Sequence, residues 1–239
     1  MVVFAEDVEL MPLPIGDEGV EVSLLDLAGL VGMESTAARV LTPEERGEYA
    51  RLGHPSRRRE WLGAKICLKA MLLRRGCVSD PMQCAIMKDA RGRPWLSFAP
   101  GLPGKIVHDC SLSHKGRFAC AGASSLVDTR IGVDVEKVSP RLLRMAGAFA
   151  GDRLSLIRPR PPEERLTLLW AVKEACAKAV GGGIGMALRH VSCEETAEGR
   201  HQVWTDEGLE FQARDFLHDG YVIAMCLRTE EVQSQRKGH

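Results

Sequence analysis

Three carboxylates and one ammonium group, carried by two short segments, have the types and spacing needed for chemistry on phosphate groups. In Ile131–Glu136, β-branched residues alternate with other types, which predicts a strand with Asp134 and Glu136 on one face. About forty residues later, a predicted helix places Glu174 and Lys178, spaced i, i+4, on one side. Carboxylate oxygens are hard ligands suited to Mg²⁺, and an ammonium group binds phosphate. The four side chains therefore predict metal-assisted phosphoryl chemistry.

Each pair taken alone also fits a solvated surface. An isolated Asp-x-Glu is more often the outer face of a half-buried strand, and an i, i+4 Glu–Lys pair stabilises a helix by only tenths of a kcal/mol. Two further features favour a site. Gly132 permits close backbone approach, and Glu174 adds a third acid to the two on the strand.

A second group of polar residues suits an anion. Ser113, His114 and Lys115 precede Gly116 in a segment expected to be a loop, and all three side chains can donate hydrogen bonds. A lone loop histidine is usually structural, and a Ser-His hydrolase lacks its nucleophile elbow here. Arg93 lies in a rigid Gly-Arg-Pro turn from which it could reach a phosphate.

Composition restricts the class of protein. The 239 residues include 32 basic and 32 acidic side chains, so no global field draws the chain to nucleic acid or to a membrane. Eight cysteines without a Cys-x-x-Cys pair argue against a zinc or redox motif and are typical of free thiols in a reducing compartment. Neither a signal peptide nor an apolar run of roughly 20 residues is present. We expect a soluble cytoplasmic protein.

Local patterns predict the elements that must position these side chains. Thr42 and Pro43, with Glu45 at capping-box spacing, predict a helix start. Arg57–Arg75 predicts a long amphipathic helix that Gly76 ends. We also expect strands at 20–27 and 117–122, a hairpin at 90–94, a helix over 163–180 that ends at the glycines 181–183, and three strands beginning near 191, 208 and 221.

A weak internal repeat has an offset of 109 residues (170 minus 61). Segment 22–27 overlies 131–136 at this offset, and three residues of the first long helix recur in the second: Trp61, Cys67 and Lys69 become Trp170, Cys176 and Lys178. In the first copy, leucines and a lysine stand where the second has its acids: Leu25, Leu27 and Lys65. The repeat predicts two similar lobes, of which only the second carries the carboxylates.

In their order along the chain, these motifs resemble the 4′-phosphopantetheinyl transferase superfamily of the two-lobed Sfp type. That family has a Gly-Lys/Arg-Pro turn, a Ser-His-Ser segment, a Gly-x-Asp-x-Glu strand and a Trp-x-x-Lys-Glu-x-x-x-Lys helix. Here they are matched by Gly92–Pro94, Ser113–Lys115, Gly132–Glu136 and Trp170–Lys178. The resemblance implies an α+β fold of two similar α/β lobes related by a pseudo-two-fold axis. Residues 1–125 would form the coenzyme A side, and residues 126–239 would carry the acids and the catalytic helix.

The resemblance also implies a reaction: transfer of 4′-phosphopantetheine from coenzyme A to a serine of an apo acyl or peptidyl carrier protein, releasing adenosine 3′,5′-bisphosphate. Asp134, Glu136 and Glu174 would hold Mg²⁺, and Glu174 is also a candidate base. The catalytic set would be Asp134, Glu174 and Lys178. The coenzyme A phosphates would be bound by Lys178, His114 and Arg93, with a hydrogen bond from Ser113.

Three positions depart from the family pattern. Lys115 replaces the second serine of Ser-His-Ser. Asp152 or Arg153 stands where family members often carry a further glutamate. The family's first-lobe basic residues are poorly matched, so the 3′-phosphate would fall to Arg46 or to the cluster 57–59, among which we assign Arg59.

An arginine-rich segment is a candidate for binding a partner protein. The segment 139–166 is rich in arginine and fits either an acidic carrier or a solvated surface: Arg141, Arg144, Arg153, Arg158, Arg160 and Arg165. A non-catalytic protein that binds coenzyme A or a carrier, and another Mg²⁺-dependent enzyme of nucleotide phosphotransfer, are the alternatives. The pathway of the carrier, in primary or secondary metabolism, is left open. Two lobes in one chain favour a monomer.

Overall fold

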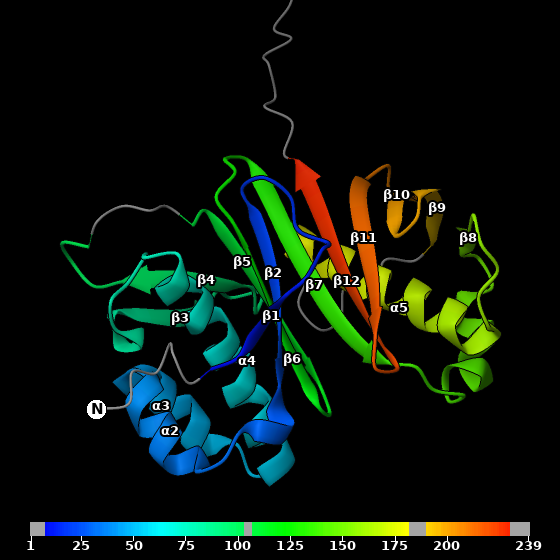
Figure 1. Ribbon diagram of the computed structural model, residues 1–239. Coiled ribbons are helices and arrows are strands. Elements are labelled where there is room, and N and C mark those ends of the chain that lie inside the picture. The colour runs from blue at the N-terminus through cyan, green and yellow to red at the C-terminus, as the bar shows by residue number, and fades with distance from the viewer. Residues whose placement is uncertain (1–7, 103–106, 182–189, 230–239) are drawn as a thin grey trace, which may run out of the picture.

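Two β-sheets, each covered by one long helix, organise the chain in the computed structural model, which describes residues 8–102, 107–181 and 190–229 (Figure 1). The first sheet has the strand order β1-β2-β6-β5, and the second has the order β7-β12-β11-β10-β9-β8. A separate hairpin, β3-β4, adjoins the first sheet. Apart from the parallel pair β8-β9, neighbouring strands are antiparallel.

Within its described residues, the first lobe contains six strands, three α-helices and two short 3-10 helices. In chain order these are β1 Leu10–Pro12, β2 Val20–Asp26, η1 Leu27–Gly29, α2 Met33–Val40, α3 Pro43–Arg51, α4 Pro55–Arg74, η2 Pro81–Gln83, β3 Cys84–Lys88, β4 Pro94–Phe98, β5 Asp109–Lys115 and β6 Phe118–Ser124. The predicted capping box begins α3: the Thr42 N–H donates to Glu45 Oε2 at 3.0 Å, and the Glu45 N–H donates to the Thr42 hydroxyl at 3.5 Å.

The second lobe follows the same plan with longer strands. Its elements are β7 Thr129–Lys137, η3 Leu142–Phe149, β8 Arg153–Ser155, α5 Pro162–Val180, β9 Val191–Ala197, β10 Arg200–Thr205, β11 Glu210–His218 and β12 Tyr221–Thr229. The helix α5 ends at Gly181, whose φ of 82° is the left-handed conformation that glycine adopts without strain. The other glycines expected at this end, 182 and 183, lie outside the described residues.

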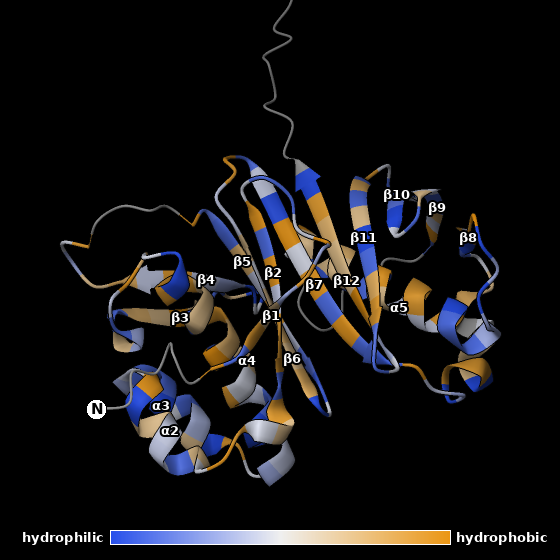
Figure 2. Ribbon diagram, viewed as in Figure 1, coloured by the Kyte–Doolittle hydropathy of each residue, from blue (hydrophilic) through white to orange (hydrophobic). Residues whose placement is uncertain are grey.

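Three zones of the hydrophobic core stack the elements in the order α4, first sheet, second sheet, α5, and a fourth, smaller zone lies between the end of α4 and β3. One zone fills the space between α4 and the first sheet, and another fills the space between α5 and the second sheet. The third lies between the sheets and joins Val22 and Leu24 of β2 to Val133 of β7 and Ile223 of β12. Figure 2 shows the strands banded with apolar and polar residues, as expected for side chains that alternate between faces.

The predicted repeat is present as a shared topology. In the first sheet β2 pairs with β6 and β6 with β5, and in the second β7 pairs with β12 and β12 with β11. In both lobes the long helix lies between the first and the later strands along the chain and packs on them. The predicted fold class, α+β with two similar lobes, is therefore confirmed. The expected boundary after residue 125 falls in the link between β6 and β7.

The outer edge of β7 is bonded by side chains instead of by another strand's backbone. On β5, Asp109, Ser111 and Ser113 accept the N–H groups of residues 131, 133 and 135 at 2.7, 3.0 and 3.3 Å. Arg93 donates to the carbonyl of residue 131 at 3.4 Å, and Lys178 donates to that of residue 133 at 2.9 Å. These five side chains on the edge of β7 form a seam that satisfies polar groups which burial would otherwise leave unpaired. The four that belong to the first lobe join it to the second, whereas Lys178 belongs to the second lobe itself.

Two sequence expectations about elements were wrong. The segment 110–116 is not a loop, because residues 109–115 form the strand β5. The described residues 190–229 contain four strands instead of the expected three, because β10 was missed. The remaining predicted helices and strands are present within a few residues of their expected bounds. Within the described residues, no helix is long and apolar enough to cross a bilayer.

Candidate active site

Gly132 brings the second long helix against β7. A Cβ atom on this residue would lie 1.8 Å from the carbonyl oxygen of Ala175 and 2.8 Å from the backbone nitrogen of Ala179, both on α5. Only a glycine fits such contacts. Because Asp134 and Glu136 follow at two-residue intervals, they share this face of β7 and point toward the same helix. The close approach predicted from the sequence thus sets the strand acids beside the side chains of α5.

Asp134 is the centre of the arrangement. Its Oδ1 atom accepts hydrogen bonds from Lys178 Nζ at 2.7 Å and from the Ser113 hydroxyl at 2.8 Å. Its other oxygen, Oδ2, is buried and has no hydrogen-bond partner among the described residues. The residue is only 5% exposed. A buried carboxylate oxygen without a partner is costly, so this atom is a candidate for binding a ligand.

The other two acids, Glu136 and Glu174, have raised pKa values. Burial raises the pKa of Glu136, and the charge of Asp134 adds to this, while Lys115 and Trp170 lower the pKa through hydrogen bonds. Burial also raises the pKa of Glu174, followed by Asp134, with Lys178 opposing and Glu136 adding to the increase. The three predicted metal-ligating carboxylates therefore lie close enough to repel one another.

These residues fit a divalent cation. Hard carboxylate oxygens are the donors that Mg²⁺ prefers, and the unpartnered Asp134 Oδ2 offers such a donor directly. A cation would also relieve the mutual repulsion of the three acids. At present, Lys178 and Lys115 supply the local positive charge, the latter through Glu136 Oε2 at 2.8 Å.

The end of β5 contributes residues with alternating directions. Ser113 and Lys115 point to the acids of β7, whereas His114 points to α4, where its Nδ1 lies 3.0 Å from Glu60 Oε2. Ser113, expected to bind a ligand, is thus engaged with Asp134. Lys115, a departure from the family pattern, forms the ion pair with Glu136.

Arg93 is placed at the C-terminus of α5. Its guanidinium donates to the carbonyls of Lys178 and Ala179 and forms an ion pair with Asp109. Cationic groups at the C-terminus of a helix satisfy its last carbonyls and its dipole. Arg93 therefore holds the end of the helix that carries Lys178. Its expected contact with a coenzyme A phosphate stays a prediction.

The three arginines at the start of α4 differ in the hydrogen bonds and ion pairs that they form. Arg59 donates to the backbone carbonyls of Leu27 and Leu30, at 2.6 and 3.0 Å. Arg58 lies 3.6 Å from Glu34 and also covers the Tyr49 ring. Arg57 is exposed, and among the described residues it forms no hydrogen bond or ion pair. Its charge acts on His114.

Asp152 does not join the acids of the site. Its buried carboxylate accepts two hydrogen bonds from Lys173, at 2.8 and 3.0 Å, and one from the N–H of Val191 at 2.8 Å. Lys173, a weaker candidate for a phosphate contact, is held in the same pair. Both residues connect α5 to the segments that flank it.

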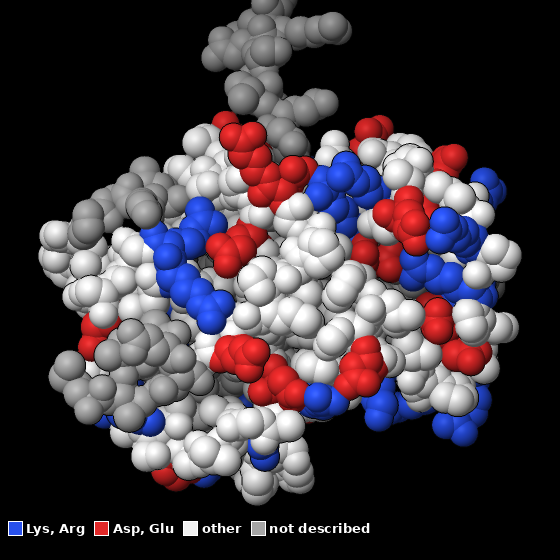
Figure 3. All heavy atoms as spheres, viewed as in Figure 1, with Lys and Arg blue, Asp and Glu red and all other residues white. Residues whose placement is uncertain are grey.

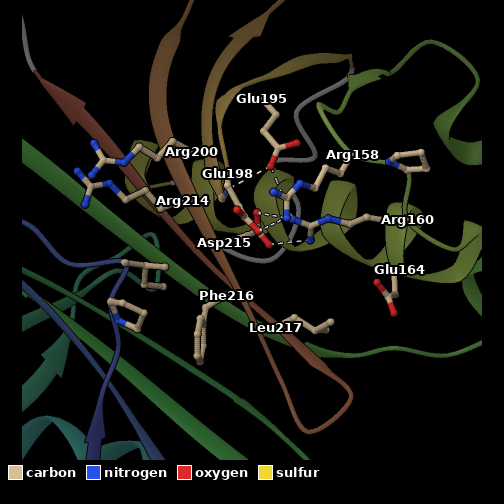
Figure 4. Close-up of a pocket in the computed structure, with 14 residues that line it drawn as sticks. Arg158, Arg160, Glu164, Glu195, Glu198, Arg200, Arg214, Asp215, Phe216 and Leu217 are labelled. Atoms are coloured by element: carbon tan, nitrogen blue, oxygen red, sulfur yellow. Dashed lines mark hydrogen bonds and ion pairs between the residues drawn. The ribbon is translucent and has the colours of Figure 1, made fainter.

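A second ionisable cluster, which the sequence reasoning missed, lies on β9, β10 and β11. Glu195, His201 and Asp215 are buried, and each offers one ligand atom within 4.8 Å of the others. The adjoining pocket, of about 490 Å³, is shown in Figure 4. However, Arg160 donates to both oxygens of Asp215, at 2.8 and 3.2 Å, and both oxygens of Glu195 accept backbone N–H groups. The acids are already satisfied, as in a buried structural network. The sequence reasoning missed this cluster because its three residues lie on three different strands, at spacings that match no recognisable motif.

The surface charges are mixed. In the view of Figure 3, groups of both signs are interspersed around a largely uncharged centre. Within the arginine-rich segment, Arg158 pairs with Glu198 and Arg160 with Asp215. Arg141 and Arg144 remain exposed at η3, which also exposes Leu143 and Met145.

The sequence of this chain is similar to those of known proteins. Residues 130–226 match the model of the 4′-phosphopantetheinyl transferase superfamily. The chain is 26% identical over 155 residues to a 4′-phosphopantetheinyl transferase of Bacillus subtilis, covering 62% of this chain and 64% of that protein. It is 27% identical over 177 residues to an L-aminoadipate-semialdehyde dehydrogenase-phosphopantetheinyl transferase of Xenopus laevis, covering 66% of this chain and 55% of that protein. The chain thus spans less than two thirds of the length of either relative.

A solved structure is also similar in part. It is a holo-(acyl-carrier-protein) synthase of Bacillus anthracis in complex with CoA (3′,5′-ADP), with a TM-score of 0.37 and 25% identity. The superposition covers 44% of this chain and 92% of that chain.

Proposed function

Through residues 130–226 the chain belongs to the 4′-phosphopantetheinyl transferase superfamily, as its motifs predicted, and we propose that it modifies an apo carrier protein with coenzyme A as donor. The 4′-phosphopantetheine group would pass to a carrier serine, and adenosine 3′,5′-bisphosphate would leave. The observation that carries the proposal is the buried, unpartnered oxygen of Asp134 amid two further acids and Lys178.

Asp134, Glu136 and Glu174 would hold Mg²⁺. When bound, the ion supplies positive charge that neutralises the phosphate oxygens of the donor. Ser113 keeps Asp134 Oδ1 in place by its hydrogen bond, which leaves Oδ2 for the cation. Lys115 holds Glu136 through both carboxylate oxygens, at 3.1 and 2.8 Å.

The chain's own groups complete the transfer. The serine hydroxyl of the carrier attacks the β-phosphorus of coenzyme A, a new P–O bond forms, and the bond to the bridging oxygen of the pyrophosphate breaks. Glu174 takes the proton of the hydroxyl, directly or through water. Lys178 stabilises the charge that develops on the phosphate oxygens, because a preorganised cation acts most strongly on the transition state.

Three basic groups are proposed to hold the donor's phosphates: Lys178, His114 and Arg57. Arg57 replaces Arg59 in this role because the guanidinium of Arg59 is bound to backbone carbonyls. Arg93 then acts chiefly by fixing the C-terminus of α5.

The carrier would dock at η3 of the second lobe. Arg141 and Arg144 offer positive charge to an acidic surface, and Leu143 and Met145, which are 40% and 44% exposed, offer apolar contact between and beside them. Since both lobes belong to one chain, we propose that a monomer is active.

Intact-mass spectrometry tests the proposal. A purified apo carrier is incubated with the protein, coenzyme A and Mg²⁺, beside samples with EDTA and with the carrier serine replaced by alanine. The expected result is a gain of one phosphopantetheine mass that both controls abolish. Coenzyme A binding without a mass gain on any of several carriers would support a binding protein instead. Release of nucleotide without carrier labelling would indicate a different phosphotransfer enzyme.

A further inference from the structure

Glu60, on α4, contacts two groups of the β5-β6 hairpin. One carboxylate oxygen lies 3.0 Å from His114 Nδ1, and the other accepts the backbone N–H of Gly116 at 2.8 Å. Glu60 and His114 are about a quarter exposed, at 25% and 29%. Because each oxygen of one planar carboxylate engages a different atom of the hairpin, the orientation of the imidazole relative to the helix is fixed.

This contact decides which ring nitrogen carries the proton. An ionised carboxylate only accepts hydrogen bonds, so the Nδ1 atom that faces Glu60 must be the donor. The other nitrogen, Nε2, has no hydrogen-bond partner among the described residues. It is therefore the atom of His114 that is available to a ligand.

The charges around the ring act in opposite directions. Burial lowers the pKa of His114, and so do the charges of Lys178 on α5 and Arg57 on α4, whereas Glu60 raises it. The pKa is lowered on balance, so Glu60 is the group of the protein that opposes loss of the imidazolium, and the negative charge of a phosphate beside Nε2 would act in the same direction. Only the imidazolium can donate from both nitrogens at once.

We propose that Glu60 is a positioning residue that presents His114 as a hydrogen-bond donor, through Nε2, to a phosphate of coenzyme A. This inference rests on the proposed function, because it assumes that coenzyme A is the donor. Glu60 itself does not touch the substrate. It belongs to the first lobe's helix, so the first lobe contributes to the site through an acid as well as through its bases.

A double-mutant cycle on coenzyme A binding tests this role. Calorimetric titration, without carrier, gives the Kd of the wild type, Glu60→Gln, His114→Ala and the double variant. We expect Glu60→Gln to weaken binding about tenfold, as lost charge-assisted hydrogen bonding does, and to add nothing once His114 is absent. Glu18→Gln, which removes an exposed acid outside the site, should leave Kd unchanged.

The pH dependence gives a second readout. The imidazolium is lost as pH rises through its pKa, and removing Glu60 lowers that pKa. The loss of affinity with rising pH should therefore begin at a lower pH in Glu60→Gln than in the wild type, and His114→Ala should not show it.

The outcomes separate the two proposals. An equal effect of Glu60→Gln with and without His114, or no effect at all, would overturn the positioning role alone. If Glu60→Gln does not fold, Glu60→Asp, which keeps the charge but withdraws it from the ring, enters the same cycle. A wild type that binds no coenzyme A would overturn the proposed function and this inference with it.

Discussion

The long helices of the two lobes carry ionisable side chains at equivalent positions but surround them differently. On α4, the side chains of Lys65 and Lys69 are 3% and 0% exposed and both contact Glu45, at 3.3 and 2.6 Å. On α5, Glu174 and Lys178 adjoin Asp134, one oxygen of which has no hydrogen-bond partner among the described residues. In the first cluster both oxygens of the acid are bonded, whereas in the second a buried carboxylate oxygen has no hydrogen-bond partner among the described residues.

The strands explain the difference. Leu25 and Leu27 occupy the first-lobe positions of Asp134 and Glu136, and both leucines are buried in the core. Lys65, at the position of Glu174, brings a positive charge that is covalently part of the chain. Burial lowers the pKa of Lys65, opposed by the charge of Glu45. The same strand–helix unit thus holds a fixed cation in one lobe and an acid in the other, where under the proposed function the cation would be a dissociable metal ion.

The largest effect is expected at Asp134. Asp134→Ala should remove a metal ligand and the partner of Lys178, and reduce carrier labelling at least about a thousandfold while the fold stays near native. Mass spectrometry measures the labelling, and circular dichroism checks the fold. Labelling at the wild-type rate would remove the metal assignment.

The equivalent test in the first lobe should affect stability instead. Glu45→Ala leaves two buried ammonium groups without their counter-charge, so we expect the free energy of unfolding to fall by about 3–5 kcal/mol. Urea denaturation measures it, with the exposed neighbour Glu44→Ala as control, where a much smaller loss is expected because its carboxylate stays in water. A loss as small as that of the control would show that this cluster contributes little.

Two glycine-to-alanine substitutions test whether the close contact between β7 and α5 requires a glycine. Gly132→Ala places a methyl group on the Ala175 carbonyl, which should lower the unfolding free energy by about 1–3 kcal/mol and reduce labelling by moving α5. Gly47→Ala, in α3 with no atom within 4 Å of its added Cβ, should instead raise it by about 0.5–1 kcal/mol. Thermal and urea unfolding of both variants measure the signs. Equal signs would contradict the packing argument.

The smallest effect is expected at the docking surface proposed at η3 of the second lobe. Reversing both charges with Arg141→Glu and Arg144→Glu should raise the KM for the carrier about tenfold and leave the Kd for coenzyme A unchanged. Steady-state kinetics and calorimetry measure the two constants. A carrier KM within error of the wild type would exclude docking at η3.

The sequence predicted the elements whose signals are local. The capping box at Thr42, the long helices and the acid-bearing strand all follow from short-range patterns, and the close approach at Gly132 followed from its missing side chain. The strand β5 was missed because serine, histidine and lysine are poor strand signals, and their partners lie on β7 and α4. The contacts of Arg93 and Asp152 could not be predicted for the same reason, because their partners are distant in sequence.

The seam along β7 makes the junction of the lobes open to mutation. In an ordinary sheet, neighbouring strands are joined by main-chain amides, which nearly all substitutions leave intact. Here Asp109, Ser111 and Ser113 provide the acceptors, so single codon changes can delete or exchange each link. Ser113 also donates a hydrogen bond to Asp134. A mutation of Ser113 that changes how the lobes fit together would therefore also change the geometry of the proposed metal site.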